Sequence, residues 1–177
     1  ILRGDELWVQ LLSEPSGGSD LAGVLTRADR DGDVFVLNGA KIWSSGADAA
    51  DFAMCLARTD WDVPKHEGLT MFLLAVHQPG VTVERIRQAD GSMEFCQEFF
   101  DDVAVPVADV VGGVGDGWAV ASRLLVHERM AVGGGSPYTS GRTIGDGAVG
   151  LAAAIPDLAR AAGRVDDPRA RALVVES

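Results

Sequence analysis

The stretch LTRADRDGDVFVLNGAKIWSS, residues 25–45, decides the fold class of this 177-residue chain. It holds two turn dipeptides, Asp31-Gly32 and Asn38-Gly39, each set between short runs of alternating apolar residues. Such dipeptides favour the left-handed backbone of two-residue hairpin loops. The stretch therefore predicts two hairpins that join three short strands, over residues 25–30, 34–37 and 42–45.

The same pattern continues along the chain. Further apolar runs predict strands over residues 52–58, 69–76, 81–86 and 93–105. Several short strands joined by turns are typical of an antiparallel barrel or sandwich. No alternation of strands with helices is present, which disfavours a Rossmann-type nucleotide-binding fold.

The period becomes helical after the glycines of residues 112–117. Asp116 is placed as an N-cap, and apolar side chains then recur at helical spacing, at Trp118, Ala121, Leu125 and Val132. Further helices are predicted over residues 148–162 and from Pro168 onward. The fold class is therefore α+β, with a β domain over residues 1–113 and the start of a helical bundle over residues 114–177.

Composition narrows the class of protein. Apolar residues make up 47% and charged residues 23% of the chain, as in globular proteins. The net charge is −11 and no Lys/Arg cluster interrupts it, so nucleic acid is not an expected partner. No run of 18 apolar residues and no signal peptide is present, so we expect no membrane span. The chain begins at Ile1 and ends at Ser177 inside a helical pattern, as expected for a piece of a longer protein.

The two cysteines, Cys55 and Cys96, have neither the CxxC spacing nor another metal-ligand spacing. Both stand in apolar surroundings, so we expect buried free thiols, no metal site and a reducing, cytoplasmic location.

The stretch SEPSGGSD, residues 13–20, combines hydroxyls, carboxylates, a proline and two glycines. Its composition suits a phosphate cradle, the floor of a cofactor site, or an ordinary surface turn in which Pro15 fixes φ. The residues of this stretch leave the three interpretations open.

Four motifs together carry a resemblance. SEPSGGSDL, NGAKIWSSGA, EFFDDVAVP, and GDGW followed by HER, in this order and spacing, resemble the acyl-CoA dehydrogenase family. The resemblance implies a β domain between two helical domains, with FAD in the crevice between the β domain and the C-terminal bundle. This chain would be the middle domain with the first helices of the C-terminal domain.

The resemblance also implies an activity, the α,β-dehydrogenation of acyl-CoA thioesters in fatty acid and lipid metabolism. No side chain accepts a hydride, so this chemistry needs a cofactor, here FAD. The implied partners are an electron-transfer flavoprotein and further subunits of a homo- or hetero-tetramer. Alternatives within the fold are an acyl-CoA oxidase, a nitroalkane oxidase, and a non-catalytic partner subunit of a mixed tetramer.

Family positions assign the cofactor contacts by resemblance. Gln10, Leu12 and Ser13 would line the isoalloxazine, while Gly18 and Ser19 would approach the flavin phosphates and the acyl-CoA chain. Two further contacts come from the KIWSSG segment. Trp43 would pack along the flavin and Ser45 would bond its polar edge, the alternative for Trp43 being a place in the core.

Glu128 is the candidate catalytic base. Some family members place this glutamate directly before an arginine, here Arg129, which would lie on the substrate side; others place it in a C-terminal segment that this chain lacks. Helical spacing sets Glu128 beside the apolar face, where desolvation would raise its pKa. The alternative is a boundary glutamate that reaches water or pairs with Arg123 or Arg129.

Overall fold

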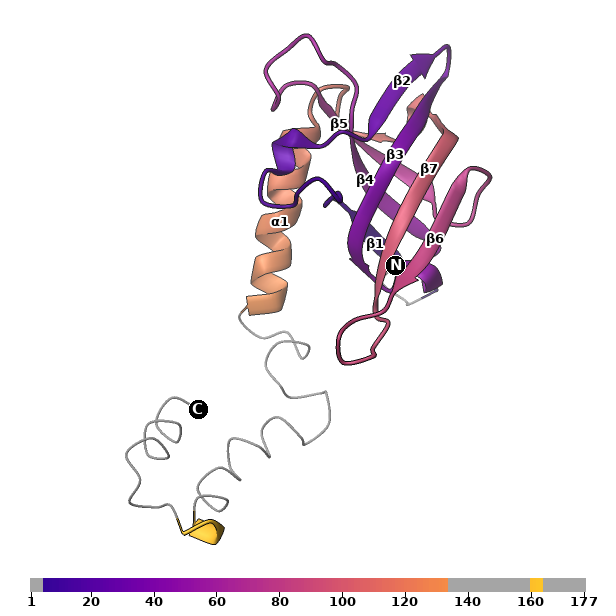
Figure 1. Cartoon of the computed structure of the whole chain (residues 1–177). Coiled ribbons are helices and arrows are strands. Elements are labelled where there is room, and N and C mark those ends of the chain that lie inside the picture. Colours follow the sequence, from indigo (N-terminus) through magenta and orange to yellow (C-terminus); the bar gives the residue numbers. More distant parts are fainter. Residues whose placement is uncertain (1–4, 134–159, 164–177) are drawn as a thin grey trace. The chain divides into compact units, whose positions relative to one another are not determined.

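The computed structural model describes residues 5–133 and 160–163 (Figure 1). The chain divides into two compact units, one that ends at Arg123 and one that begins at Leu124. The boundary expected near residue 113 between the β domain and the helical domain stays a prediction.

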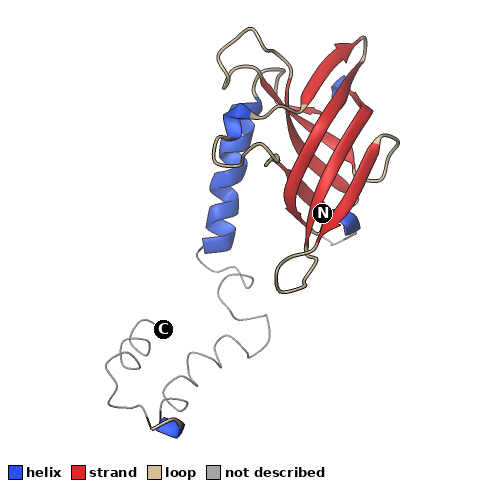
Figure 2. Ribbon diagram, viewed as in Figure 1, coloured by secondary structure: helices blue, strands red, loops and turns tan. Residues whose placement is uncertain are grey.

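The first unit is a mostly β domain, as predicted, followed by the start of a helix (Figure 2). Short 3-10 helices join some of its strands. The strands are β1 Trp8–Leu11, β2 Arg27–Asp31, β3 Val34–Ser45, β4 Phe52–Arg58, β5 Leu69–Ala75, β6 Val81–Ile86, β7 Phe95–Pro106 and β8 Val110–Val111.

The strands form one sheet in the order β6-β7-β3-β2-β4-β5-β8. Most neighbours run antiparallel, and the two long strands β3 and β7 pair along most of their length (Figure 1). The exceptions are at β4, to which both β1 and β2 run parallel. β1 pairs with it from Trp8 opposite Phe52 to Leu11 opposite Cys55. β2 pairs with β4 only at Arg27 and Arg58, so β1 and β2 share one edge of β4.

The first predicted hairpin is confirmed and the second is wrong. Asp31 and Val34 pair across the turn at Gly32, which has a φ of 59°. Asn38-Gly39, in contrast, lies inside β3, at a bulge where β3 continues to pair with β7. A Cβ on Gly39 would lie 2.8 Å from the Cα of Thr26, so this glycine allows a close backbone approach rather than a turn.

The core consists of the buried apolar side chains that the strands turn to one face of the sheet. Strand alternation turns Phe35 and Leu37 of β3 inward, and the ring of Phe35 meets that of Phe72 edge to face at 5.1 Å. Cys55 and Cys96 are free and buried there, as predicted. Burial raises the pKa of the Cys55 thiol to about 12, so this group is inert as a nucleophile.

In the part of the chain that the structure describes, one long helix, α1, spans Gly117–Gly133 and follows Asp116 as predicted. The Asp116 carboxylate accepts from the N–H of Gly113 at 2.8 Å, within the turn that precedes the helix. Of the predicted helix over residues 148–162, residues 160 and 161 are helical, residue 162 is in a turn, and residues 148–159 lie outside the described residues. The predicted helix after Pro168 lies outside them as well. Among the helices of the described ranges, none has the length and apolar character to cross a bilayer.

Candidate functional site

The predicted cofactor-contacting turn follows directly from β1. Gln10 is half-buried on β1, Leu12 is buried, and Ser13 is half-buried at the point where the chain leaves the sheet. The Ser13 carbonyl accepts from the N–H of Ile42 at 2.9 Å. This bond fastens the start of the turn to β3, one residue before Trp43.

The turn itself is closed by its own backbone. Glu14 and Gly17 exchange N–H···O bonds of 2.9 and 3.3 Å. Gly18 and Ser19 follow, both exposed to solvent. A Cβ on Gly18 would lie 3.1 Å from the Ser13 hydroxyl oxygen, so glycine keeps this hydroxyl uncrowded. The surface-turn and cofactor-floor interpretations are both compatible with this geometry.

Trp43 is the extra residue of β3 at a second bulge in its pairing with β7, between Ile42 and Ser44. Its φ is 68°, a left-handed conformation that costs a bulky residue about 1–3 kcal/mol. The side chain is 56% exposed and meets Phe95 edge to face at 5.9 Å. Trp43 is therefore not a core residue, and its indole is available to a ligand. Ser45, two residues on, is also exposed.

A buried ion pair lies behind the turn. The Lys41 ammonium is fully buried and donates to Glu14 Oε1 at 2.8 Å and to the Leu12 carbonyl at 3.1 Å. The Glu14 carboxylate also accepts from the N–H groups of Leu25 and Thr26, at 2.6 and 2.9 Å. Burial raises the pKa of Glu14, but the Lys41 charge and these donors outweigh it, so its pKa lies below its usual range.

A second buried carboxyl lies behind Trp43. Glu98 of β7 is fully buried and accepts from the Ser44 hydroxyl, which also donates to the Cys96 carbonyl at 3.4 Å. Its Oε2 has no hydrogen-bond partner among the described residues. Burial raises the pKa of Glu98 to about 7, against the lowering effects of the Ser44 bond and the Lys41 charge.

The sequence interpretation missed these buried groups, although the sequence carries a signal for two of them. Lys41 continues the inward alternation of Phe35 and Leu37, and Glu98 continues that of Cys96 and Phe100. Period 2 alone therefore places both charged side chains inside the sheet.

Glu128 and Arg129 lie on α1 in the second unit, and both side chains are exposed. The burial expected beside an apolar face is thus not supplied by the described residues, because the side chains from Val126 to Met130 are all exposed. The role of Glu128 as base stays a prediction. The structure brings Ser13, Gly18 and Trp43 together on the first unit, whereas Glu128 and Arg129 belong to the other unit.

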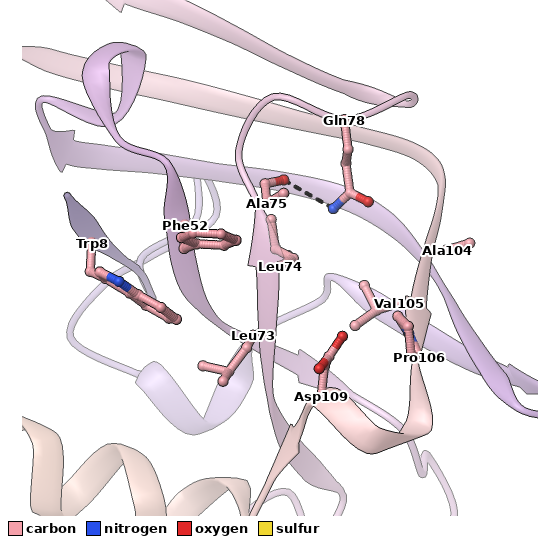
Figure 3. A pocket seen from close by; sticks show the side chains of 10 residues that line it. All are labelled: Trp8, Phe52, Leu73, Leu74, Ala75, Gln78, Ala104, Val105, Pro106 and Asp109. Atoms are coloured by element: carbon pink, nitrogen blue, oxygen red, sulfur yellow. Dashed lines mark hydrogen bonds between the residues drawn. The ribbon is translucent and has the colours of Figure 1, made fainter. Parts of the chain in front are cut away.

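A metal centre and a cavity are two other types of site. In the described part of the chain, no group of three or more His, Cys, Asp and Glu side chains could hold a metal ion. A cavity of about 260 Å³ lies where Trp8 stacks on Phe52, with ring centroids 5.0 Å apart (Figure 3). Asp109 lies at its edge, and Gln78 donates to the Ala75 carbonyl there at 3.0 Å. None of the predicted cofactor-contacting residues lines this cavity.

The grouped residues fit a flavin. A flat heterocycle with a polar edge needs an aromatic wall and nearby hydrogen-bonding groups. The exposed indole of Trp43 and the hydroxyls of Ser13 and Ser45 are of these types. The Ser13–Ile42 bond places the turn and the tryptophan on neighbouring segments, as one surface requires.

Two curated relatives come from Mycobacterium tuberculosis. The chain is 45% identical to acyl-CoA dehydrogenase FadE34 over 135 residues, which cover 76% of this chain and 19% of FadE34. It is 40% identical to acyl-CoA dehydrogenase IpdE1 over 166 residues, which cover 94% of this chain and 41% of IpdE1. The chain thus spans less than half the length of these relatives.

Solved structures agree. The Tcur3481-Tcur3483 steroid ACAD matches 99% of this chain and 43% of its own, with a TM-score of 0.81 and 32% identity. The ChsE4-ChsE5 complex from M. tuberculosis matches 88% of this chain and 38% of its own, with a TM-score of 0.70 and 32% identity. A structure described as the electron transferring flavoprotein of Acidaminococcus fermentans matches 73% of this chain and 34% of its own, with a TM-score of 0.68 and 29% identity.

The sequence model of the acyl-CoA dehydrogenase middle domain matches residues 10–103, more than half of this chain of 177 residues. These residues include the second half of β1, the turn after it, Trp43 and most of the sheet. The chain therefore belongs to the acyl-CoA dehydrogenase family and carries its middle domain.

Proposed function

We propose that the protein carrying this chain is an FAD-dependent enzyme that introduces an α,β double bond into acyl-CoA thioesters. The observation that carries the proposal is the bond between the Ser13 carbonyl and the Ile42 N–H. This bond joins the turn after β1 to the strand of Trp43. The hydroxyl of Ser13 and the exposed indole of Trp43 therefore belong to neighbouring segments of an acyl-CoA dehydrogenase middle domain.

The cofactor contacts are part of this proposal. Gln10, Leu12 and Ser13 bind the isoalloxazine through backbone groups and the Ser13 hydroxyl, and Trp43 packs along it, with Ser45 at its polar edge. Gly18 and Ser19 lie on the side of the flavin phosphates and the acyl-CoA chain. When bound, FAD supplies the acceptor for the hydride that leaves Cβ.

The proton at Cα requires a base, and Glu128 is the proposed residue, with Arg129 as a substrate-side cation. The exposed position of Glu128 on α1 is compatible with a role as base only if parts of the protein beyond the described residues exclude water from its carboxylate. An electron-transfer flavoprotein is the proposed electron acceptor. A chain similar to this one belongs to the A. fermentans structure that is described as such a flavoprotein, and this supports the pairing.

A mixed tetramer is the second candidate, in which this chain is one of two kinds of subunit. Two solved structures similar to the chain are of named pairs, Tcur3481-Tcur3483 and ChsE4-ChsE5. The first of them is described as a steroid ACAD, which supports a bulky polycyclic acyl group as substrate. A cytoplasmic location, which accords with the two free thiols, is part of the same proposal.

The test uses the full-length protein. Its visible spectrum is recorded, and straight-chain, branched and steroid acyl-CoAs are added without oxygen to wild type, Glu128→Gln and the control His127→Gln. The proposal predicts bleaching near 450 nm with wild type and the control, and none with Glu128→Gln although FAD stays bound. Bleaching that survives Glu128→Gln would move the base to another segment.

Two further outcomes separate the alternatives. Rapid reoxidation of the bleached flavin by air would indicate an oxidase. A colourless protein that becomes coloured and active only when a second subunit is co-expressed would establish the mixed tetramer. A colourless protein that no acyl-CoA perturbs in either form would contradict the enzyme proposal.

A further inference from the structure

We propose that four buried polar residues, Glu14, Lys41, Ser44 and Glu98, act together as a positioning device for the turn after β1 and for Trp43. We call them the interior polar cluster. None of the four is a predicted cofactor contact, and all lie behind the surface that holds such contacts. The part of the inference that concerns flavin rests on the proposed function, whereas the part that concerns the turn and Trp43 does not.

Lys41 is the centre of the first half of the cluster. Its ammonium donates to the Leu12 carbonyl and to Glu14, on either side of Ser13. A buried ammonium needs such partners, because leaving it unpaired in the interior costs several kcal/mol. The backbone of Ser13 is thus held by one side chain, besides its own bond to Ile42.

Glu14 extends this hold to a second segment. Its carboxylate accepts from the N–H groups of Leu25 and Thr26, which precede β2. The turn is therefore tied at one end to β3 and through Glu14 to the chain before β2. A surface turn closed only by its own backbone would need none of these buried bonds.

Glu98 and Ser44 form the second half. Ser44 directly follows Trp43, and its hydroxyl donates inward to Glu98 Oε1 and to the Cys96 carbonyl. A bulky residue keeps a left-handed φ only where its surroundings over-determine that conformation. The inward bonds of Ser44, with the edge contact of Phe95, fix the bulge and turn the Trp43 indole outward.

The two halves are neighbours in the sheet. Lys41 and Glu98 stand directly opposite each other on β3 and β7. The charged and titratable groups that interact with Glu98 are Lys41 of β3, Cys55 of β4 and Cys96 of β7. The Lys41 charge is already matched by Glu14, so ionised Glu98 would be a second, unmatched carboxylate in the interior.

The protonation state of Glu98 therefore bears on the geometry of Trp43. Its unpartnered Oε2 and its burial favour the protonated form, and its pKa is raised to about 7. Loss of this proton places a negative charge beside the bulge, and the site draws in water or shifts to solvate it. The environment of Trp43 should then change around neutral pH.

The first experiment follows Trp43 in the full-length protein as purified. The fluorescence of Trp43 is obtained by subtracting the emission of Trp43→Phe from that of wild type, at each pH from 5 to 9. The expected result is a transition near pH 7 that is absent in Glu98→Gln, which keeps an acceptor for Ser44 but cannot ionise. A transition that persists unchanged in Glu98→Gln, or a wild type without one, would overturn this half.

The second experiment follows backbone amides by hydrogen exchange. Lys41→Met is compared with Arg27→Met, which removes one partner of an exposed ion pair on β2. The expected result is at least about tenfold faster exchange at Leu25, Thr26 and Ile42 in Lys41→Met, beyond any change shared by the whole sheet, and no such effect in Arg27→Met. Acceleration spread evenly over all strands would indicate general destabilisation and contradict a positioning role.

If Lys41→Met does not fold, Glu14→Gln provides the same test, because it weakens the bonds to Leu25 and Thr26 but keeps the shape of the side chain. Both experiments read the protein's own amides and indole, so their result stands even if no acyl-CoA bleaches the flavin. The FAD dissociation constant is measured last. Together the two proposals predict that this constant increases at least about tenfold in Lys41→Met and does not change in Arg27→Met. An unchanged constant in Lys41→Met would contradict the part of the inference that concerns flavin.

Discussion

The pairing of β3 with β7 is interrupted by two bulges, the first on β7 opposite Asn38 and the second on β3 at Trp43, and they are held in different ways. At the first, Asn38 donates to Asp102 Oδ1 and accepts from the Asp102 N–H, both at 2.9 Å, on the exposed side. At the second, Ser44 bonds inward to the fully buried Glu98. The first bulge relies on an amide and a solvated carboxylate, whereas the second relies on a carboxyl in the interior. Only the second therefore depends on a buried titratable group and its buried neighbours.

The largest expected effect comes from Lys41→Met, beside the second bulge. It leaves the Glu14 carboxylate buried without its cation, which should lower the free energy of opening of β3 and β4 by about 3–5 kcal/mol. Amide hydrogen exchange on the full-length protein measures this quantity. Arg27→Met, at an exposed pair, should change it by less than about 1 kcal/mol. Equal effects of the two substitutions would contradict the difference between buried and exposed support.

Glu98 should make the stability of the sheet depend on pH. Because its pKa is about 7 in the folded protein and lower in the unfolded chain, the unfolded chain releases this proton first as pH rises. The free energy of opening should thus fall from about pH 5 to pH 8, by roughly 3 kcal/mol in total. Glu98→Gln should remove this slope, and a slope retained in that variant would assign it elsewhere.

Glu14 acts in a separate pH window. Its lowered pKa means that its contribution to stability is present above its ordinary range and is lost as pH falls through the lowered value. A decrease in stability in acid, below the ordinary pKa range of a glutamate, is therefore distinct from the effect of Glu98 near neutrality.

Trp43→Gly should raise the stability of β3, whereas the substitutions above should lower it. Glycine adopts a positive φ without strain, and Trp43 is more than half exposed, so the substitution should stabilise β3 by about 1 kcal/mol. It should at the same time weaken FAD binding if the proposed function holds. Trp61→Gly is the matched control, since Trp61 is 47% exposed without a positive φ and stacks under the Arg58 guanidinium. A loss of stability in Trp43→Gly would contradict stored strain.

The smallest effect is expected at the first bulge. Asn38→Ala removes two hydrogen bonds that are open to solvent and should lower the free energy of opening by about 1 kcal/mol. The Asp102 amide should exchange faster, with no change in the Trp43 fluorescence. A shift in that fluorescence would show that the two bulges are coupled, contrary to the comparison above.

The sequence was sufficient for most of the sheet and for one of its two hairpins. Alternation located β2 and the strands from β4 to β7, and Asp31-Gly32 is a true hairpin turn. β1 and β8 were not predicted, and β3 was predicted as two strands. Asn38-Gly39 looked the same locally, but pairing of β3 with the distant β7 overrides the turn preference, and Gly39 makes room for Thr26. No local pattern contains that information.

The candidate site was predictable in part. The motifs identified the segments of Ser13 and Trp43, and the structure brings these segments together through Ile42. The interior position of Lys41 could be read from its strand, but its partner Glu14 lies 27 residues away along the chain, and only the fold shows the pair. The relation of Glu128 to this surface stays a prediction, because it belongs to the other unit.

The parallel pairing of β1 with β4 has a consequence for the order of folding. The hairpins β2–β3 and β4–β5 can close as soon as each is synthesised, but Trp8 must wait for Phe52, 44 residues later, which is several seconds of translation. The turn at Ser13 is carried on the waiting segment. During this interval the Lys41 ammonium lacks its bonds to the Leu12 carbonyl and to Glu14, and it stays hydrated. The docking of β1 is therefore also the step at which this charge is desolvated. We expect this late step to be slow and to be the one most easily disturbed by substitution of Lys41 or Glu14.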